Sequence, residues 1–267
     1  MKKFEGIMLC SDIDATLTND KNEVSKENLE AIKYFTENGG TFTVATGRIP
    51  LTIPSVLDKY ISIPVVCQNG SAIYDVHTKK YVMYKEIDDK ARKITKEIAD
   101  KFPFVGIEFY RLYDIAFIKE NAATNRHIKL EKIPCATHLD CEIDEVEGPV
   151  IKILFAQEKD ENDILDKAYE NSEYQKEYKL LKSHEWYYEI LRKDISKGTA
   201  LKQLCDLTGF DLKNVITAGD NDNDIAMIKA SGLGYAVENA TENLKKVADR
   251  ITRNNNCSAI ADIIFKI

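Results

Sequence analysis

Short apolar runs alternate with helix-like segments at both ends of the chain, and this alternation restricts the possible folds more than any other feature. The first helix-like segment has Ser25 as its N-cap and ends at Gly39-Gly40. The strand-like runs are 7–10, 41–45, 64–68, 214–220 and 234–237. The other helix-like segments are 54–60, 197–209, 224–231, 242–248 and 259–265. Nearly continuous apolar strands separated by helices predict an α/β fold with a Rossmann-like parallel sheet covered on both faces.

The middle of the chain follows a different pattern. It contains most of the thirteen tyrosines and the only tryptophan, Trp186. Its predicted elements are the strands 108–118 and 149–157, the helix 91–102, a polar helix at 161–171 and the segment EWYYEILR at 185–192. We therefore predict a core domain formed by residues 1–84 and 191–267, with an inserted α+β domain at 85–190.

Composition and charge exclude several classes of protein. The 267 residues, of which 44% are hydrophobic, are enough for one large domain or two moderate ones. The net charge is -7 and there is no basic block, so neither nucleic acid nor a membrane is an expected partner. The six cysteines form no C-x-x-C pair, and the first apolar run is too short for a signal peptide or a membrane span. We expect a cytoplasmic protein with reduced thiols, either a monomer or a weak homo-oligomer.

Two clusters of acids follow apolar strands. Asp12 and Asp14 come after the run 7–10, and Asp220 ends the run 214–220, with Asp224 four residues later. The carboxyl ends of parallel strands emerge at one edge of a sheet, so these acids can converge there and hold a cation between them. A solvated turn is the alternative for each cluster alone. Neither cluster has the Gly and Glu spacing of an EF-hand calcium loop.

The residue types at this edge favour a magnesium and phosphate site. Carboxylate oxygens suit Mg²⁺ better than Zn²⁺, and the four histidines show no ligand spacing. In the turn ATGR, Thr46 offers a hydroxyl group and Gly47 offers an open backbone N–H to an anionic oxygen. Lys197 begins a predicted helix and can place an ammonium group near the same edge. A common turn and a solvated surface lysine are the alternatives for these two segments.

In this order, SDIDATL, ATGR, ISKGTAL and AGDNDNDIAMI resemble the four motifs of the haloacid dehalogenase superfamily. The last two motifs, the QNG at 68–70 and the placement of the middle region are most similar to the Cof-type phosphatases. Those proteins carry an α/β cap domain of type IIB. The resemblance covers the whole chain and implies a Mg²⁺-dependent phosphatase with a Rossmann-like core.

The resemblance also implies roles for individual residues. Asp12 would be the nucleophile that forms an aspartyl-phosphate, and Asp14 would carry the proton to and from the reacting oxygens. Asp12, the backbone carbonyl of Asp14, and Asp220 would bind Mg²⁺, with Asp224 orienting its neighbours or holding water at the metal. The residues expected to bind the phosphoryl group are Thr46, Gly47, Lys197 and Asn223. Asp222 falls at a variable position and is expected at the surface.

One position departs from the family pattern. The family usually has Gly after its second acid, where this chain has Ala15. If the backbone there needs a positive φ, alanine costs roughly 1 kcal/mol; if φ is negative, the methyl group is harmless.

Three functions remain open at this stage. The first is a phosphatase acting on a small phosphorylated metabolite, with a sugar phosphate as the expected class, because a cap would exclude polymers from the site. The second is a phosphosugar mutase of the same superfamily. The third is a non-catalytic protein that senses a ligand, which the full set of Asp12, Asp14, Lys197 and Asp220 disfavours.

Overall fold

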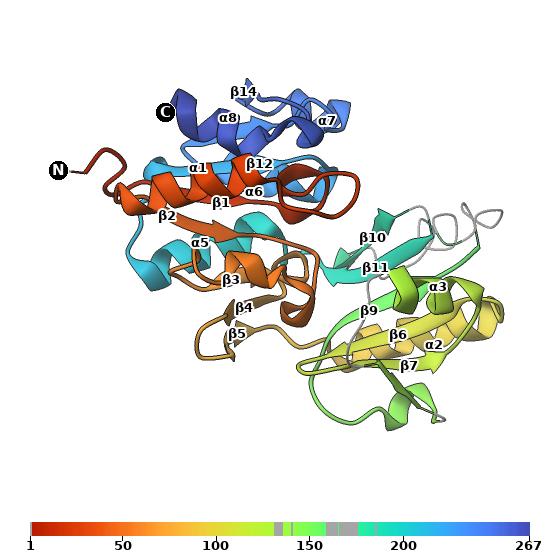
Figure 1. Cartoon of the computed structure of the whole chain (residues 1–267). Helices are drawn as coiled ribbons and strands as arrows, with labels where there is room; N and C mark the ends of the chain where they lie inside the picture. Colours follow the sequence, from red (N-terminus) through yellow and green to blue (C-terminus); the bar gives the residue numbers. More distant parts are fainter. Residues whose placement is uncertain (1, 131–135, 140, 159–164, 166–175, 185) are drawn as a thin grey trace. The chain divides into compact units, whose positions relative to one another are not determined.

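The chain forms two compact units. The computed structural model describes residues 2–130, 136–139, 141–158, 165, 176–184 and 186–267. The core unit comprises Met1–Met83 and Ser196–Ile267, and the cap unit comprises Tyr84–Ile195 (Figure 1). The second boundary lies later than the predicted residue 191. The reason is that strand β11 (Tyr187–Arg192) belongs to the cap sheet, and Lys193 N still donates to Glu177 O at 2.9 Å.

A parallel sheet forms the centre of the core unit. Its strands in spatial order are β14 (Arg250–Ile251), β13 (Leu233–Ala236), β12 (Val215–Gly219), β1 (Met8–Ser11) and β2 (Thr41–Val44). Every neighbouring pair in this sheet is parallel. The predicted α/β fold class is confirmed.

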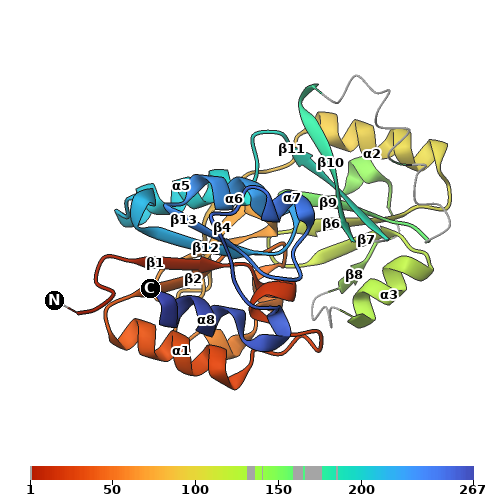
Figure 2. The same ribbon diagram turned by 90° about the horizontal axis from the view of Figure 1, so that it is seen from above.

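Helices cover both faces of this sheet. In both views α1 (Lys26–Glu37) and α8 (Ala259–Lys266) lie on one face, and α5 (Lys197–Thr208) and α6 (Ile225–Ala230) lie on the other (Figures 1 and 2). Successive side chains of β1 point to opposite faces of the sheet. Leu9 packs in the hydrophobic cluster that includes α1 and α8, while Met8 and Cys10 pack in the cluster that includes α5. The short helix α7 (Glu242–Lys245) follows β13. The Ser25 hydroxyl accepts from Asn28 N, as expected for the N-cap of α1.

The run 64–68 does not join the parallel sheet as a full strand. It forms β3 (Val65–Cys67), which pairs antiparallel with β4 (Ala72–Asp75) in a three-stranded sheet completed by β5 (Lys80–Tyr84). A single parallel bridge between Ala45 and Val66 connects this small sheet to the end of β2. The reason is that β3 pairs with β4, the strand that follows QNG. The sequence pattern did not reveal this partner. The predicted helix at 54–60 is reduced to single short turns such as Ser55–Leu57.

The cap unit contains a six-stranded sheet. Its strands in spatial order are β10 (Tyr178–His184), β11, β9 (Val150–Ala156), β6 (Gly106–Arg111), β7 (Ile115–Lys119) and β8 (Ala136–His138). All pairs are antiparallel except β7 with β8. Helices α2 (Asp89–Lys101) and α3 (Ala122–Leu130) lie on opposite faces in both views (Figures 1 and 2).

Some predictions fall wholly or partly outside the described residues. The polar helix at 161–171, apart from residue 165, and Cys135 lie there. Of the other cysteines, Cys10, Cys67 and Cys205 are buried free thiols, as expected from their apolar neighbours. Within the described ranges, none of the helices has the length and apolar character needed to cross a bilayer.

Candidate active site

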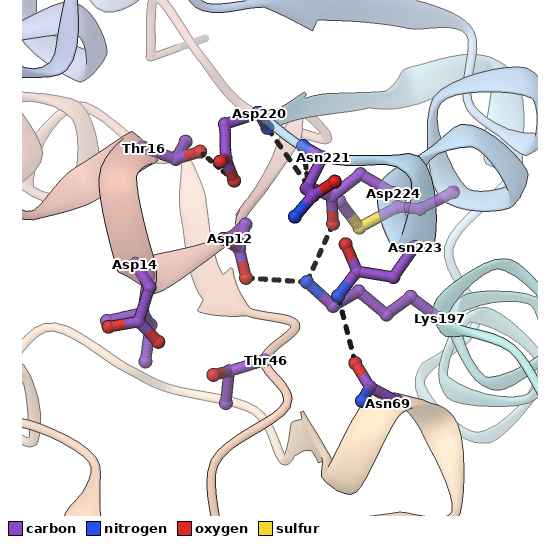
Figure 3. Close-up of polar contacts among 12 residues, drawn as sticks. Asp12, Asp14, Thr16, Thr46, Asn69, Lys197, Asp220, Asn221, Asn223 and Asp224 are labelled. Carbon is purple, nitrogen blue, oxygen red and sulfur yellow. Dashed lines mark hydrogen bonds and ion pairs between the residues drawn. The ribbon is translucent and has the colours of Figure 1, made fainter. Parts of the chain in front are cut away.

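The two acid clusters meet at the carboxyl edge of the core sheet. Strands β1 and β12 are neighbours, with Ser11 opposite Ala218, so Asp12 and Asp220 follow adjacent strand ends. The register continues past the strand, because Asp12 N donates to Ala218 O at 2.9 Å. Figure 3 shows Asp12, Asp220 and Asp224 close together at this edge. The structure therefore confirms the prediction that the two acid clusters converge at one edge of the parallel sheet.

Lys197 places its ammonium group between two of these acids. Its Nζ lies 2.6 Å from Asp12 Oδ1 and 2.7 Å from Asp224 Oδ1 (Figure 3). The lysine is the first residue of α5 and is 1% exposed, and Ser196 caps the helix by accepting from Thr199 N. The helix start thus fixes a buried cation beside the predicted nucleophile, and Lys197 is not the solvated surface residue of the alternative interpretation.

Asp224 organises the second acidic loop from within. While its Oδ1 contacts Lys197, its Oδ2 accepts from the backbone N–H groups of Asp220 at 3.0 Å and Asn221 at 3.2 Å. Both oxygens are therefore occupied within the protein. This agrees with the expected role of Asp224 in orienting its neighbours. Asp222 is exposed, as expected, and accepts from Thr241 Oγ1 and Asn243 Nδ2.

Burial and mutual repulsion perturb the charges of the site. Burial raises the pKa of Asp12 well above its ordinary value, and nearby Asp224, Asp220 and Asp14 add to the rise while Lys197 opposes it. Burial together with the Asp224 charge raises the pKa of Asp220 to about 6. Burial alone would lower the pKa of Lys197, but Asp12 and Asp224 raise it above its ordinary value. The lysine therefore stays protonated, and three acidic side chains share this single ammonium group.

The donor set fits a divalent cation. One carboxylate oxygen from each of Asp12, Asp220 and Asp224 lies within 4.8 Å of the others, and in the described part of the chain no other group of acids, histidines and cysteines meets this condition. The ligands are all oxygens, which hard cations prefer over sulfur or imidazole. Thr16 Oγ1 donates to Asp220 Oδ1 at 3.3 Å, which holds this carboxylate in the cluster. A cation here would relieve the repulsion that raises the pKa of Asp12 and Asp220.

The residues predicted to bind a phosphoryl group lie in three segments of the core unit, after β2, at the start of α5 and after β12. Thr46 is fully buried and follows β2, and its Oγ1 accepts from Arg48 N at 3.1 Å. Asn223 donates from Nδ2 to Asn69 Oδ1 at 3.0 Å (Figure 3). The Thr46 backbone is tied to the same turn, since Asn69 N donates to Thr46 O at 3.0 Å. Their roles in binding a phosphoryl group remain predictions.

Asp14 occupies a different environment from Asp12. Its carboxylate accepts three hydrogen bonds from Arg48, with Nη2 to Oδ1 at 2.6 Å, Nε to Oδ2 at 3.0 Å and Nε to Oδ1 at 3.2 Å. The Asp14 side chain is 49% exposed, compared with 6% for Asp12. The Asp14 carboxylate is therefore open to solvent, whereas the buried Asp12 is shielded from it. The nucleophilic role of Asp12 and the proton-carrying role of Asp14 remain predictions.

Ala15 adopts the left-handed conformation that glycine favours. Its φ is 52° and its ψ is 13°, within the tight turn Ile13–Leu17. The backbone at residue 15 therefore has the positive φ at which alanine is unfavourable. Its methyl group costs roughly 1 kcal/mol of stability. Asn239 Nδ2 donates to Ala15 O at 2.8 Å and supports the strained turn from the other end of the chain.

The structure adds three residues that sequence reasoning did not place in the site. Arg48 pairs with Asp14, Asn69 pairs with Asn223, and Thr16 pairs with Asp220. All three stand inside quoted motifs, Thr16 in SDIDATL, Arg48 in ATGR and Asn69 in QNG. Their place within the motifs was the available signal, but the partners of Thr16, Arg48 and Asn69 lie 204, 34 and 154 residues away. Local sequence could not specify such pairs.

Comparison with known proteins agrees with this geometry. The haloacid dehalogenase-like hydrolase family matches residues 9–264, nearly the whole chain. The chain belongs to this family. Its motif order, core sheet and mixed cap sheet are those of the Cof-type haloacid dehalogenase hydrolases, so the resemblance seen in the sequence is confirmed.

Relatives and solved structures extend over the full length of this hydrolase. The chain is 28% identical over 276 residues to the putative phosphatase YxeH of Bacillus subtilis, with 97% of each protein covered. It is 26% identical to the 5-amino-6-(5-phospho-D-ribitylamino)uracil phosphatase YwtE of the same organism, with 96% of each covered. A haloacid dehalogenase-like hydrolase from Bacteroides thetaiotaomicron matches with a TM-score of 0.85 at 24% identity, covering 97% of this chain and 98% of that one. The curated relatives support phosphoric monoester hydrolysis by this family member.

Proposed function

We propose that this hydrolase is a Mg²⁺-dependent phosphatase that hydrolyses a small phosphorylated metabolite, with a sugar phosphate as the substrate class. The observation that carries the proposal is the buried Asp12 carboxylate, held 2.6 Å from Lys197 Nζ inside a group of three acids. A carboxylate needs no deprotonation before it attacks phosphorus. The surrounding cationic groups would offset the charge of the arriving phosphate ester.

Asp12 and Asp14 would share the chemistry in two steps. In the first step an Asp12 oxygen forms a bond to phosphorus, the ester P–O bond breaks, and Asp14 gives its proton to the leaving oxygen. In the second step Asp14 takes a proton from water while the water oxygen attacks phosphorus. The bond between phosphorus and Asp12 then breaks, which frees inorganic phosphate and restores the carboxylate.

The other site residues would position the phosphoryl group. Asp12, the Asp14 carbonyl and Asp220 would hold Mg²⁺, which supplies charge neutralisation at the phosphoryl oxygens when it is bound. Thr46, the Gly47 N–H and Asn223 would donate hydrogen bonds to these oxygens, and Lys197 would screen Asp12 from them. In this mechanism most of the catalysis comes from neutralising the charge of the phosphoryl group and from orienting it, as phosphoryl transfer requires.

The relatives support a small substrate. One is named a pyridoxal phosphate phosphatase, from Escherichia coli, at 24% identity, and YwtE is named for a phosphorylated ribityl compound. A structurally similar protein is a subclass IIB sugar phosphatase, with a TM-score of 0.82 at 18% identity, covering 97% of this chain and 98% of that one. This likeness concerns the fold. We assign the choice of metabolite to the unit Tyr84–Ile195, which would act as a type IIB cap.

Phosphate release provides the test. Wild type and Asp12→Asn are assayed on p-nitrophenyl phosphate and on a panel of phosphorylated sugars and cofactors, with Mg²⁺ or with EDTA. Asp58→Asn, at an exposed position of the same unit, is the matched control. We expect Asp12→Asn to lower kcat by about 10³-fold or more, EDTA to abolish turnover, and the control to leave it unchanged.

The alternatives give different results in the same assay. Equal rates for wild type and Asp12→Asn would contradict the mechanism. Absence of turnover on every compound would favour the non-catalytic ligand sensor. Dependence on a bisphosphate activator, with return of the phosphoryl group to the sugar, would favour the mutase.

A further inference from the structure

The turn QNG, residues 68–70, follows β3 in an unusual backbone conformation. Gln68, Asn69 and Gly70 have consecutive positive φ angles of 51°, 56° and 97°. Left-handed backbone is unfavourable for residues with a side chain and persists where the surrounding structure enforces it. Two such residues in a row, both buried, indicate that this turn is held by its contacts rather than by its own preference.

The turn contacts the loop that carries Thr46 and Gly47. Asn69 N donates to Thr46 O at 3.0 Å, and Gln68 N donates to Arg48 O at 3.1 Å. The Asn69 amide also lies against Gly47, since a Cβ added to Gly47 would be only 3.2 Å from Asn69 Oδ1. The position of Asn69 therefore depends on a glycine at residue 47, and the two loops pack as one unit.

The same turn contacts the start of α5. A Cβ added to Gly70 would lie 2.2 Å from Ser196 O and 3.0 Å from Lys197 N. Such distances leave no room for a side chain, so the turn and the helix start touch through their backbones. The QNG turn consequently contacts the segments of three predicted phosphoryl-binding residues: Thr46, Gly47 and Lys197.

The Asn69 side chain connects the turn to the fourth predicted residue. Asn69 is 3% exposed, and its Oδ1 accepts from Asn223 Nδ2 at 3.0 Å. The Asn223 Oδ1 is buried and has no hydrogen-bond partner among the described residues. The bond from Asn69 is therefore what orients the Asn223 amide in this structure. An amide nitrogen carries two hydrogens, so one remains to donate to another acceptor in a fixed direction.

We propose that Asn69 is a positioning residue that orients Asn223 toward a phosphoryl oxygen. It does so by accepting one Asn223 N–H and thereby directing the second. The strained QNG turn is maintained because it brings this acceptor against Gly47 and the start of α5. The inference rests on the proposed phosphatase function, in which Asn223 contacts the phosphoryl group.

The variant Asn69→Gly separates the effect of the Asn69 side chain from the effect of the backbone conformation of the turn. Glycine adopts a positive φ without strain, so this variant loses the amide while the turn stays permitted. Asn22→Gly is the matched control, because Asn22 also has a positive φ, of 60°, and is exposed. We expect Asn69→Gly to weaken the affinity for inorganic phosphate and to lower kcat/KM about tenfold each, with an unchanged melting temperature. The control should change neither value.

Coupling to Asn223 distinguishes a positioning role from a direct one. If Asn69 acts through Asn223, the double variant Asn69→Gly/Asn223→Ala will bind phosphate as weakly as Asn223→Ala alone. Additive losses would overturn the proposal, because Asn69 would then contact the ligand independently. Unchanged phosphate affinity in Asn69→Gly would overturn it as well.

The readouts separate this proposal from the proposed function. If wild type hydrolyses nothing, the phosphatase assignment fails, while calorimetry with inorganic phosphate and Mg²⁺ still measures the coupling. If Asn69→Gly does not fold, Gly47→Ala displaces the same amide through its new Cβ. Its effect on phosphate affinity should then vanish in an Asn223→Ala background, and an additive effect would contradict the positioning role.

Discussion

Among the described residues, both units of this hydrolase bury charged side chains, and the core unit gathers three acids around a single ammonium group. In the described part of the cap unit Lys152 Nζ lies 3.0 Å from Glu189 Oε1, and His127 Nδ1 lies 2.8 Å from Glu108 Oε2, so each of these two buried carboxyl groups has a nitrogen partner of its own. In the core unit one ammonium, that of Lys197, serves two of three clustered acids. Balanced pairs can stabilise a fold by themselves, whereas the excess of carboxylates calls for another cation.

The two units also differ in backbone strain. All six non-glycine residues that have positive φ in the described ranges belong to the core unit, and Ala15, Gln68 and Asn69 lie in its loops at the site. Such strain costs about 1 kcal/mol or more per residue. The core unit therefore gives up stability, through clustered charge and through backbone strain, at the place where function is proposed.

Removing the lysine of each buried cluster is expected to have the largest effect. Lys197→Met leaves two acids without their ammonium, and Lys152→Met removes the ammonium beside the buried Glu189, so each should lower the free energy of unfolding by roughly 3–5 kcal/mol. Urea denaturation with and without Mg²⁺ distinguishes the two variants. Mg²⁺ should restore part of the loss in Lys197→Met only, and equal responses would remove the distinction between the clusters.

The pH dependence of Asp220 should produce the next largest effect. Because its pKa is raised to about 6 in the folded protein, the folded state binds this proton more tightly than the unfolded state, whose aspartate titrates near 3.8. The contribution of Asp220 to stability therefore falls as pH rises from about 4 to about 6 in EDTA. Asp220→Asn should consequently gain roughly 2 kcal/mol over wild type at neutral pH and little at pH ~4.

Urea denaturation of both proteins between acid and neutral pH measures this difference. The exposed Asp222→Asn controls for a general loss of negative charge. Wild type should recover stability when Mg²⁺ replaces EDTA, and Asp220→Asn should not. A gain of the same size at every pH would argue against a raised pKa at Asp220.

Glycine substitutions should have opposite signs in the two units. Ala15→Gly relieves a φ of 52° and should raise the free energy of unfolding by about 0.5–1 kcal/mol, after the entropy that glycine adds to the unfolded chain. Ala116→Gly, in the ordinary strand β7 of the cap, is the matched control and should lower it by about 1 kcal/mol. Thermal unfolding reports both. A loss of stability in Ala15→Gly would show that the turn is not strained.

The smallest effect is expected when both members of a cap pair are replaced together. Lys152→Met/Glu189→Leu removes the charges without leaving one unpaired, so its stability should stay within about 1 kcal/mol of wild type. Chemical denaturation of the double variant and of each single variant measures the coupling. If the double variant were as unstable as Lys152→Met, the pair would be more than a balanced structural contact.

Much of the fold could be predicted because it depends on local patterns. The strands β1, β2 and β12 and the N-cap Ser25 follow from apolar runs and capping chemistry near each residue. The pairing of β3 with β4 could not be predicted, since periodicity marks a strand without naming its neighbour. The bonds of Arg48 and Asn69 were missed for the same reason, because each depends on a partner distant in the sequence.

The sequence by itself determined that acids would gather at one edge of a sheet. Asp12 and Asp220 each follow an apolar run, and parallel strands place such residues together whatever lies between them. Only the tertiary structure decided how the charges are shared. Lys197 reaches Asp12 across 185 residues, Arg48 holds Asp14 instead, and Ala15 takes a positive φ. These outcomes depend on distances between loops and on burial, which exist only once the chain has folded.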